Sequence, residues 1–205
     1  MVCETTEKTM NEIKTFKVGN KTVKICLDEE PENPRTNDHS DTMICFHKRY
    51  SLGDKHDYKY EDYGGWEEFE KQLIKDFDPV EIRPLYMYDH SGLTISSSPF
   101  SCPWDSGKIG FILMGKKQAR ECYMTKRITK EIRERVNKYL NASIEEYDNY
   151  LRGSVYGYVI EDENEEHVDS CWGFNGDLDY IEKEAKETAK AIIEQERRAT
   201  IELVV

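Results

Sequence analysis

The sequence predicts an α+β fold, in which a mostly antiparallel sheet carries helices packed on one face. Segments that alternate apolar and polar residues, as strands do, are interspersed with segments whose apolar residues recur every three or four positions, as in helices. These segments do not follow the regular strand–helix–strand repeat of a parallel sheet. A chain of 205 residues is most simply one domain, predicted at residues 11–205 after a disordered N-terminus at 1–10.

The first predicted element is a β-hairpin. Glu12–Val18 and Lys21–Leu27 both alternate apolar and polar side chains, as half-buried strands do. Gly19-Asn20 between them suits a two-residue turn with a positive backbone angle at the glycine. We therefore expect two antiparallel strands near the N-terminus.

The next part of the chain contains a loop, a strand and a helix. Residues 28–41 are rich in turn formers and contain two prolines, and residues 42–47 (TMICFH) predict a buried strand. The polar, tyrosine-rich connection 48–63 is unusually long for a plain linker. Trp66–Phe77 carries one apolar stripe at helical spacing, and Pro79 is expected to stop that helix.

The central segment, residues 85–112, reads LYMYDHSGLTISSSPFSCPWDSGKIGFI and holds the densest collection of chemically reactive side chains. Strands are predicted at 85–88, 93–97 and 108–113, around loops rich in Asp, His, Ser and Cys. Rigid strands that present such loops are a common way to build a functional site. A short helical piece follows at 116–123.

Two consecutive helices are predicted after it. Apolar residues spaced four apart indicate a helix over 130–140, and residues 141–143 (Asn-Ala-Ser) are expected to break it. Ser143 and Glu146 then match the capping-box pattern that opens a helix, which would continue to residue 151.

The last third of the chain is predicted as strand, acidic turn, strand and helix, at residues 155–160, 161–166, 168–174 and 177–198. Asp177 or Asp179 is expected to cap the helix. Residues 201–205 are expected to form a final edge strand.

Composition narrows the class of protein. No apolar run approaches the ~20 residues of a membrane span, and the N-terminus has no apolar block of a signal peptide. None of the six cysteines falls at CxxC spacing, which argues against a zinc ribbon or a redox pair. We therefore expect a protein of the reducing cytoplasm, with no membrane contact.

Charge is unevenly distributed along the chain. The balance is −7 over residues 1–114, +6 over 115–140 and −11 over 141–205, which gives the total of −12. Such a protein is repelled by free nucleic acid at long range and attracted to basic surfaces, so a nucleic-acid-binding protein is a plausible partner. The alternative is that these charges only keep exposed faces solvated.

Four segments carry a resemblance to a known family: residues 42–58, 84–112, 145–160 and 169–176. Through its YDHSGLTIS, PFSCPWDSG, GFI and DSCWGF motifs the chain resembles an uncharacterised family of bacteriophage and mobile-element proteins. The resemblance implies an accessory protein acting inside a host cell. Many such proteins block host defence nucleases, in the manner of anti-CRISPR or anti-restriction proteins and DNA mimics.

The predicted function follows from charge and context together. An acidic inhibitor would cover a partner surface that has evolved to bind phosphates, with no cofactor and no direct contact to nucleic acid. Acids of the 161–166 turn and three tyrosines, which are frequent at interface hot spots, form the predicted partner-binding set: Glu161, Asp162, Glu163, Glu165, Glu166, Tyr58, Tyr60 and Tyr63.

An enzyme remains the alternative. Cys102 is a candidate nucleophile with His90 or His47 as its base, and Asp89 and Asp105 complete the candidate cluster of a hydrolase. A divalent metal could be bound by histidines and carboxylates that fall in three loops, namely His47, His56, Asp57, Asp89, His90 and Asp105. No pair of them has HxH or HxxxH spacing, and structural roles for the histidines and for Cys102 are favoured.

Two further alternatives concern ligands. Trp104 and Trp172 each lie beside Asp, Ser and Gly and would form a small-molecule pocket if their loops met, although both are favoured as core residues. A basic stretch would engage phosphates of nucleic acid, the least favoured option because glutamates dilute it: Lys116, Lys117, Arg120, Lys126, Arg127, Lys130, Arg133 and Arg135.

Overall fold

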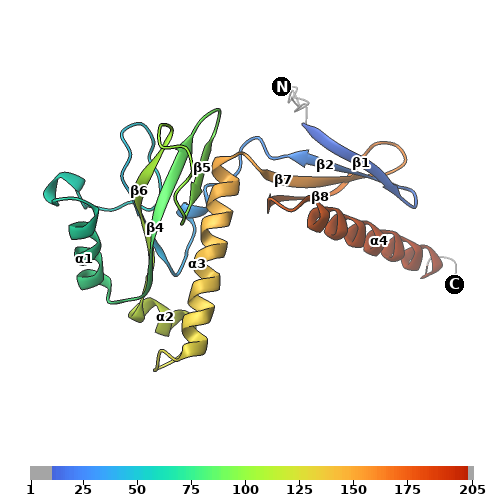
Figure 1. Ribbon diagram of the computed structural model, residues 1–205. Coiled ribbons are helices and arrows are strands. Elements are labelled where there is room, and N and C mark those ends of the chain that lie inside the picture. The colour runs from blue at the N-terminus through green and yellow to red at the C-terminus, as the bar shows by residue number, and fades with distance from the viewer. Residues whose placement is uncertain (1–10, 203–205) are drawn as a thin grey trace, which may run out of the picture. The chain divides into compact units, whose positions relative to one another are not determined.

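The computed structural model describes residues 11–202, and they form two compact units, each with its own four-stranded antiparallel sheet (Figure 1). Unit 1 comprises the chain up to Glu32 together with the chain from Gly153 onward, and unit 2 comprises Asn33–Arg152. The α+β class with antiparallel strands is confirmed. The sequence indicated one sheet and one domain, whereas the two units have separate cores. The N-terminus predicted to be disordered lies outside the described residues.

Unit 1 is one sheet covered on one face by one helix. Its strands are β1 (Glu12–Val18), β2 (Lys21–Leu27), β7 (Val155–Glu161) and β8 (His167–Asn175), in the order β1-β2-β7-β8. The predicted turn is present, with Gly19 at φ 59°. The helix α4 (Leu178–Glu202) is capped by Asp177, whose carboxylate accepts the backbone N–H groups of residues 179 and 180.

Alternation in the strands decides which face of this sheet is covered. Val23 and Ile25 of β2 and Tyr158 and Ile160 of β7 point toward α4 and pack against its buried stripe of Ile181, Ala185 and Ala189. Residues of α4 up to Glu202 are helical, so the edge strand predicted from residue 201 is wrong for 201–202, and 203–205 lie outside the described residues.

Unit 2 has a sheet with helices on both faces (Figure 1). Its strands are β3 (Thr42–Cys45), β4 (Pro79–Asp89), β5 (Leu93–Ser96) and β6 (Ser106–Gly115), in the order β3-β6-β4-β5. The helices are α1 (Trp66–Phe77), α2 (Lys116–Cys122) and α3 (Lys130–Leu151), and two short 3-10 turns are η1 (Pro34–Thr36) and η2 (Tyr60–Asp62).

The apolar run of β6 is explained by the helices that cover both faces of the sheet. Ile112 and Met114 pack on the side of α2 and α3, while Phe111 and Leu113 pack on the side of α1. A strand buried on both faces loses the polar alternation of a half-buried strand. The expectation of helices on one face therefore fits unit 1, whereas unit 2 adds a second helical layer.

The helix break predicted at 141–143 is wrong, because α3 continues through it. Its buried stripe runs without interruption from Ile132 through Leu140 to Ile144 and Tyr147. Ser143 does not cap a helix. Its hydroxyl donates to Asp41 (2.8 Å) and accepts from Arg35 (3.0 Å), so tertiary contacts take up the polar group that suggested a break.

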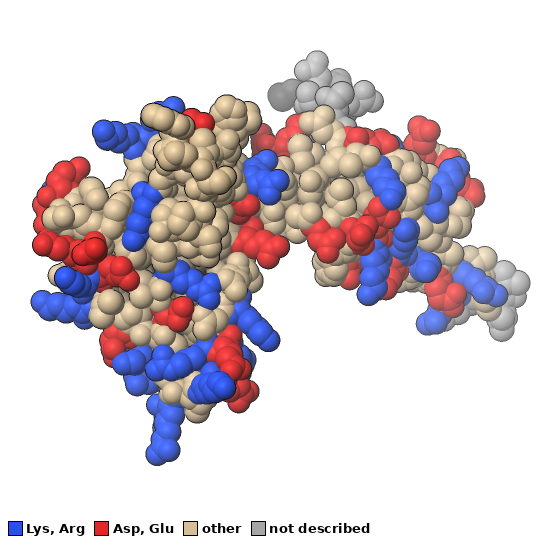
Figure 2. All heavy atoms as spheres, in the orientation of Figure 1, with Lys and Arg blue, Asp and Glu red and all other residues tan. Residues whose placement is uncertain are grey.

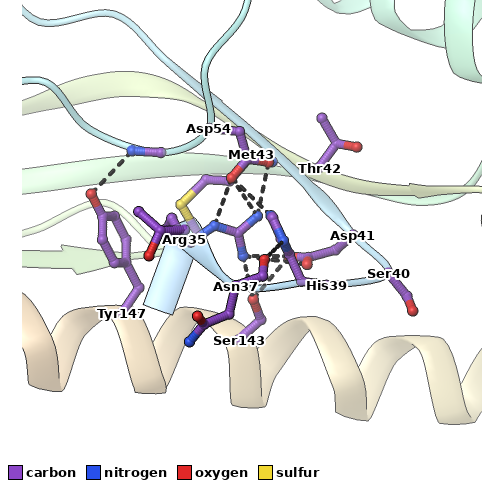
Figure 3. A network of polar contacts seen from close by, with 12 residues as sticks. Arg35, Asn37, His39, Ser40, Asp41, Thr42, Met43, Asp54, Ser143 and Tyr147 are labelled. Carbon is purple, nitrogen blue, oxygen red and sulfur yellow. Dashed lines mark hydrogen bonds and ion pairs between the residues drawn. The ribbon is translucent and has the colours of Figure 1, made fainter. Parts of the chain in front are cut away.

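Arg35 is the centre of a buried polar network that ties the loops of unit 2 to α3 (Figure 3). Its guanidinium donates to both carboxylate oxygens of Asp54 (2.8 and 2.9 Å) and to Asp41, whose side chain is fully buried. Asp54 also accepts the backbone N–H of Met43 at 2.7 Å. Burial acts to lower the pKa of Arg35, but the hydrogen bonds and charges of the two carboxylates outweigh it and leave that pKa raised.

Among the helices of residues 11–202, none combines the length and the apolar composition that a membrane-spanning segment needs.

Candidate functional site

The predicted acidic turn at residues 161–166 has five acids, of which two make contacts that hold the turn and three are exposed. Glu161 is buried and accepts a hydrogen bond from Lys24 at 2.8 Å, and this bond raises the pKa of Lys24. Asp162 closes the turn by accepting the backbone N–H groups of Asn164 and Glu166, which lower its pKa. Glu161 and Asp162 therefore shape the turn. The exposed members are Glu163, Glu165 and Glu166.

The three predicted partner-binding tyrosines belong to an aromatic cluster rather than to an exposed surface. Tyr58 and Tyr63 pack on the buried Phe69, and the hydroxyl of Tyr58 donates to Asp76 at 2.9 Å. Burial, followed by that hydrogen bond, raises the pKa of Tyr58 to about 12. Tyr60 is half-buried and lies 4.6 Å from Trp66 between ring centroids.

Both predicted core tryptophans are exposed, so their assignment to the core is wrong. Trp104 is 91% exposed in the loop that precedes β6. Trp172 is 42% exposed and lies across Gly157, where an added Cβ would come within 2.3 Å of its indole. The two residues belong to different units.

The candidate catalytic residues of the central segment partly converge at one end of the unit 2 sheet. The backbone N–H of Asp89 donates to the carbonyl of Asp105 at 2.8 Å and joins the two loops. One oxygen of Asp105 lies 3.6 Å from both His90 Nδ1 and Cys102 Sγ. The carboxylate therefore stands between thiol and imidazole, whereas a nucleophilic triad needs the imidazole in the middle, where it can take the proton.

Asp89 and His47 face a neighbouring loop instead. Asp89 forms an ion pair with Arg49 and accepts a hydrogen bond from the hydroxyl of Tyr50 at 3.3 Å. His47 stacks on Tyr50, and its Nδ1 accepts the backbone N–H groups of residues 49 and 50. Within residues 11–202, no three His, Cys, Asp or Glu side chains come together as a metal site would require.

Two of the described thiols are too buried for chemistry. Cys26 is inaccessible and Cys45 is 7% exposed, and burial raises the pKa of Cys45 to about 12. Such a thiol carries almost no thiolate, which is the nucleophilic form. Both cysteines therefore have structural roles.

The predicted basic stretch forms a surface around α2 and the beginning of α3 (Figure 2). Several of its members have protein partners. Lys116 pairs with Asp78 at 2.7 Å, and Arg133 donates to the carbonyl of Val80 at 3.2 Å. Arg135 lies 4.3 Å above the ring of Tyr123. Part of this charge therefore holds local structure.

Net charge separates between the two units. Unit 1 has 10 Lys and Arg against 21 Asp and Glu, a balance of −11, whereas unit 2 has 19 against 20, a balance of −1. Nearly all of the net negative charge therefore belongs to the smaller unit. Exposed acids are found on its turn at Glu163, Glu165 and Glu166 and on α4 at Asp179 and Glu187. We call these five residues the acidic set.

A pocket of about 1210 Å³, here called the aromatic pocket, is formed in unit 2 by residues of the segment 45–61 and by Trp66. The sequence did not predict it. Its one signal was the length of the tyrosine-rich connection 48–63. The pocket is lined by ring side chains and by four exposed bases, Lys48, Arg49, Lys55 and Lys59. It adjoins the Asp89 cluster through Arg49 and Tyr50.

Comparison with known proteins brings no match: no family model, no curated protein and no solved structure is similar to the chain. The resemblance to a bacteriophage protein family therefore stays a prediction.

Proposed function

We propose that this protein is an acidic inhibitor of phage or mobile-element origin that binds a basic surface of a host defence nuclease system. The observation that supports the proposal is the charge separation, −11 in unit 1 against −1 in unit 2. The negative field of unit 1 would attract a basic surface that normally binds phosphates, and this attraction would speed association.

The acidic set is the proposed contact surface. Its members are exposed, whereas other acids of unit 1 already serve the fold: Glu161 pairs with Lys24, and Glu196 pairs with the buried Lys21 at 2.7 Å. Carboxylates without a structural task can pair with a partner's bases at no cost to the fold. The mechanism would be occlusion of the nuclease surface, with no chemistry performed on the nucleic acid.

The test uses a five-site variant of the full chain, E163Q/E165Q/E166Q/D179N/E187Q. Wild-type protein is expected to reduce DNA cleavage by a restriction complex or a CRISPR effector nuclease, and its affinity should fall as salt rises from about 50 to 300 mM. The variant should bind about tenfold more weakly or worse at low salt and show a flatter salt dependence. Binding is measured by calorimetry and cleavage by gel assay.

The control variant D38N/D57N/D62N/E121Q/E145Q removes the same number of exposed acids from unit 2. It has the same net charge as the test variant, so it should retain inhibition if position matters. Equal loss in both variants would show that only total charge counts. Undiminished cleavage in the presence of wild-type protein, across both classes of nuclease, would remove the proposal.

A further inference from the structure

The aromatic pocket of unit 2 has the composition of a ligand site and more than enough room for a small molecule. Its volume of about 1210 Å³ is above the roughly 300–1,000 Å³ typical of small-molecule pockets. We propose that it binds a nucleotide, meaning a ligand in which a planar nucleobase is joined to phosphate. The inference concerns unit 2 and does not depend on the acidic set of unit 1.

Ring side chains form two groups on the pocket wall. His47 and Tyr50 are stacked, with centroids 4.9 Å apart and planes within 9° of parallel. In the second group, Tyr60 lies 4.6 Å from Trp66 and 5.6 Å from Phe46. Each of these rings is half-buried, so part of its surface is accessible to a ligand. Flat, exposed rings are the usual support for a nucleobase.

The second group is anchored in the core. Phe46 lies edge-on to Phe69 at 5.1 Å, and Trp66 lies edge-on to Phe111 at 6.1 Å. Phe69 and Phe111 are completely buried. Rings fixed in this way lose little conformational freedom when a ligand stacks on them, which favours binding.

The pocket is locally basic in a strongly acidic chain. Its lining includes the exposed cations Lys48, Arg49, Lys55 and Lys59 and only two carboxylates, those of Asp54 and Glu61. Asp54 accepts two hydrogen bonds from Arg35, whose charge it shares with Asp41. The remaining balance is positive, and exposed lysines and arginines beside aromatic rings suit the phosphate of a nucleotide.

The loop that supplies these groups is held in place by polar contacts. Arg49 pairs with Asp89, and Tyr50 donates to the same carboxylate at 3.3 Å. His47 Nδ1 accepts two backbone N–H groups, so the neutral ring carries its proton on Nε2. That N–H is a further donor for a phosphate or nucleobase oxygen. Together these contacts preorganise one edge of the pocket.

Other ligand classes fit less well. A cationic ligand would be repelled by the four bases, and an uncharged apolar ligand would make no use of the three lysines. An acidic peptide that carries an aromatic residue shares part of the chemistry, and competition can distinguish it. The nucleotide could be free or could be one unit of a single strand, since both present a base and a phosphate.

The experiment is calorimetric titration of the full chain with AMP, adenosine, ribose 5-phosphate and the oligonucleotide (dT)10. AMP is expected to bind about tenfold more tightly than adenosine or ribose 5-phosphate, because only AMP engages both rings and cations. Tight AMP binding identifies a free nucleotide as the source, and binding of (dT)10 alone identifies a strand. Each of these two results supports the site.

Two variants locate binding in the pocket. K55E/K59E should weaken AMP binding about tenfold or more, whereas K71E/K75E, with the same spacing on the exposed side of α1, should change it by less than about twofold. Tyr60→Ala should reduce AMP affinity toward that of ribose 5-phosphate, and Tyr60→Phe, which retains the ring, should not. Circular dichroism confirms that each variant is folded.

Several outcomes would overturn the inference. They are the absence of binding by both AMP and (dT)10 at about 1 mM, equal affinities for AMP and adenosine, and equal losses in the two lysine variants. Displacement of AMP by the peptide Glu-Tyr-Glu at similar concentration would equally reject a nucleotide site.

Discussion

The two units differ in how helices cover the faces of their sheets. Unit 1 packs one face of its sheet against α4, its one helix within the described residues, and Trp172 lies across Gly157. Unit 2 covers both faces of its sheet, with α2 and α3 on one side and α1 on the other. Unit 1 has nearly all of the net negative charge, whereas unit 2 has the buried polar network and the aromatic pocket.

This difference suggests a division of tasks. An exposed, charged surface suits contact with a large partner, because it attracts from a distance. A doubly covered sheet gives rigid walls on which loops can build a concave site. Changes confined to one unit should therefore leave the other intact, and the following predictions test that independence.

The largest effect is expected from Arg35→Met in unit 2. The substitution leaves the fully buried Asp41 charge without its partner, which costs about 3–5 kcal/mol of unfolding free energy. Hydrogen exchange, read separately for the two units, should show loss of protection in residues 33–152 and little change in unit 1. The pair of the exposed Arg49 and the half-buried Asp89 provides the comparison, since Arg49→Met should cost less than about 1 kcal/mol. Equal loss of protection in both units would show that they fold as one.

A smaller effect is expected from alkaline pH, again in unit 2. Burial raises the pKa of Cys45 from 9.0 to about 12, so the folded state favours the protonated thiol. The stabilisation is complete below pH 9 and declines as pH rises toward 12, by about 2–3 kcal/mol at pH 11. Urea unfolding at several pH values measures the decline. Cys45→Ala removes this titration, so its unfolding free energy should fall less steeply between pH 9 and 11; an identical slope would contradict the assignment.

The smallest effect is expected in unit 1 from Gly157→Ala. The added Cβ would lie 2.3 Å from the indole of Trp172 and 2.8 Å from the carbonyl of Cys171. We expect a loss of about 1–2 kcal/mol, confined to unit 1. In a Trp172→Ala background the loss should be smaller, because the indole contact is gone and only the backbone contact remains. Thermal unfolding of the four proteins measures the coupling, and purely additive losses would mean that the indole does not rest on Gly157.

Local patterns were sufficient to predict most elements. The hairpin at Glu12–Leu27 and the helix Trp66–Phe77 were predicted with the bounds that the structure shows, because alternation and helical spacing depend only on near neighbours. The helix break at residues 141–143 was predicted wrongly for the same reason. Ser143 looks like a cap in the sequence, and only its contacts with Arg35 and Asp41 show why the helix continues.

The candidate sites were only partly predictable. The sequence identified the reactive residues near Asp105. It did not show that the Asp105 carboxylate lies between the thiol and the imidazole, because this arrangement depends on where two loops meet. The sequence also identified the acidic turn, but it did not show that Glu161 forms an ion pair with Lys24. The aromatic pocket was visible only as an overlong polar connection, because a pocket is a property of side-chain placement rather than of composition.

The sequence by itself determined the α+β class, the antiparallel pairing and the concentration of acid toward the C-terminus, since these follow from periodicity and counting. Tertiary structure alone decided that the chain forms two units, because β2 and β7, which flank unit 2 in the sequence, pair with each other. It also decided which acids and aromatic rings remain accessible, because burial depends on partners that are distant in sequence.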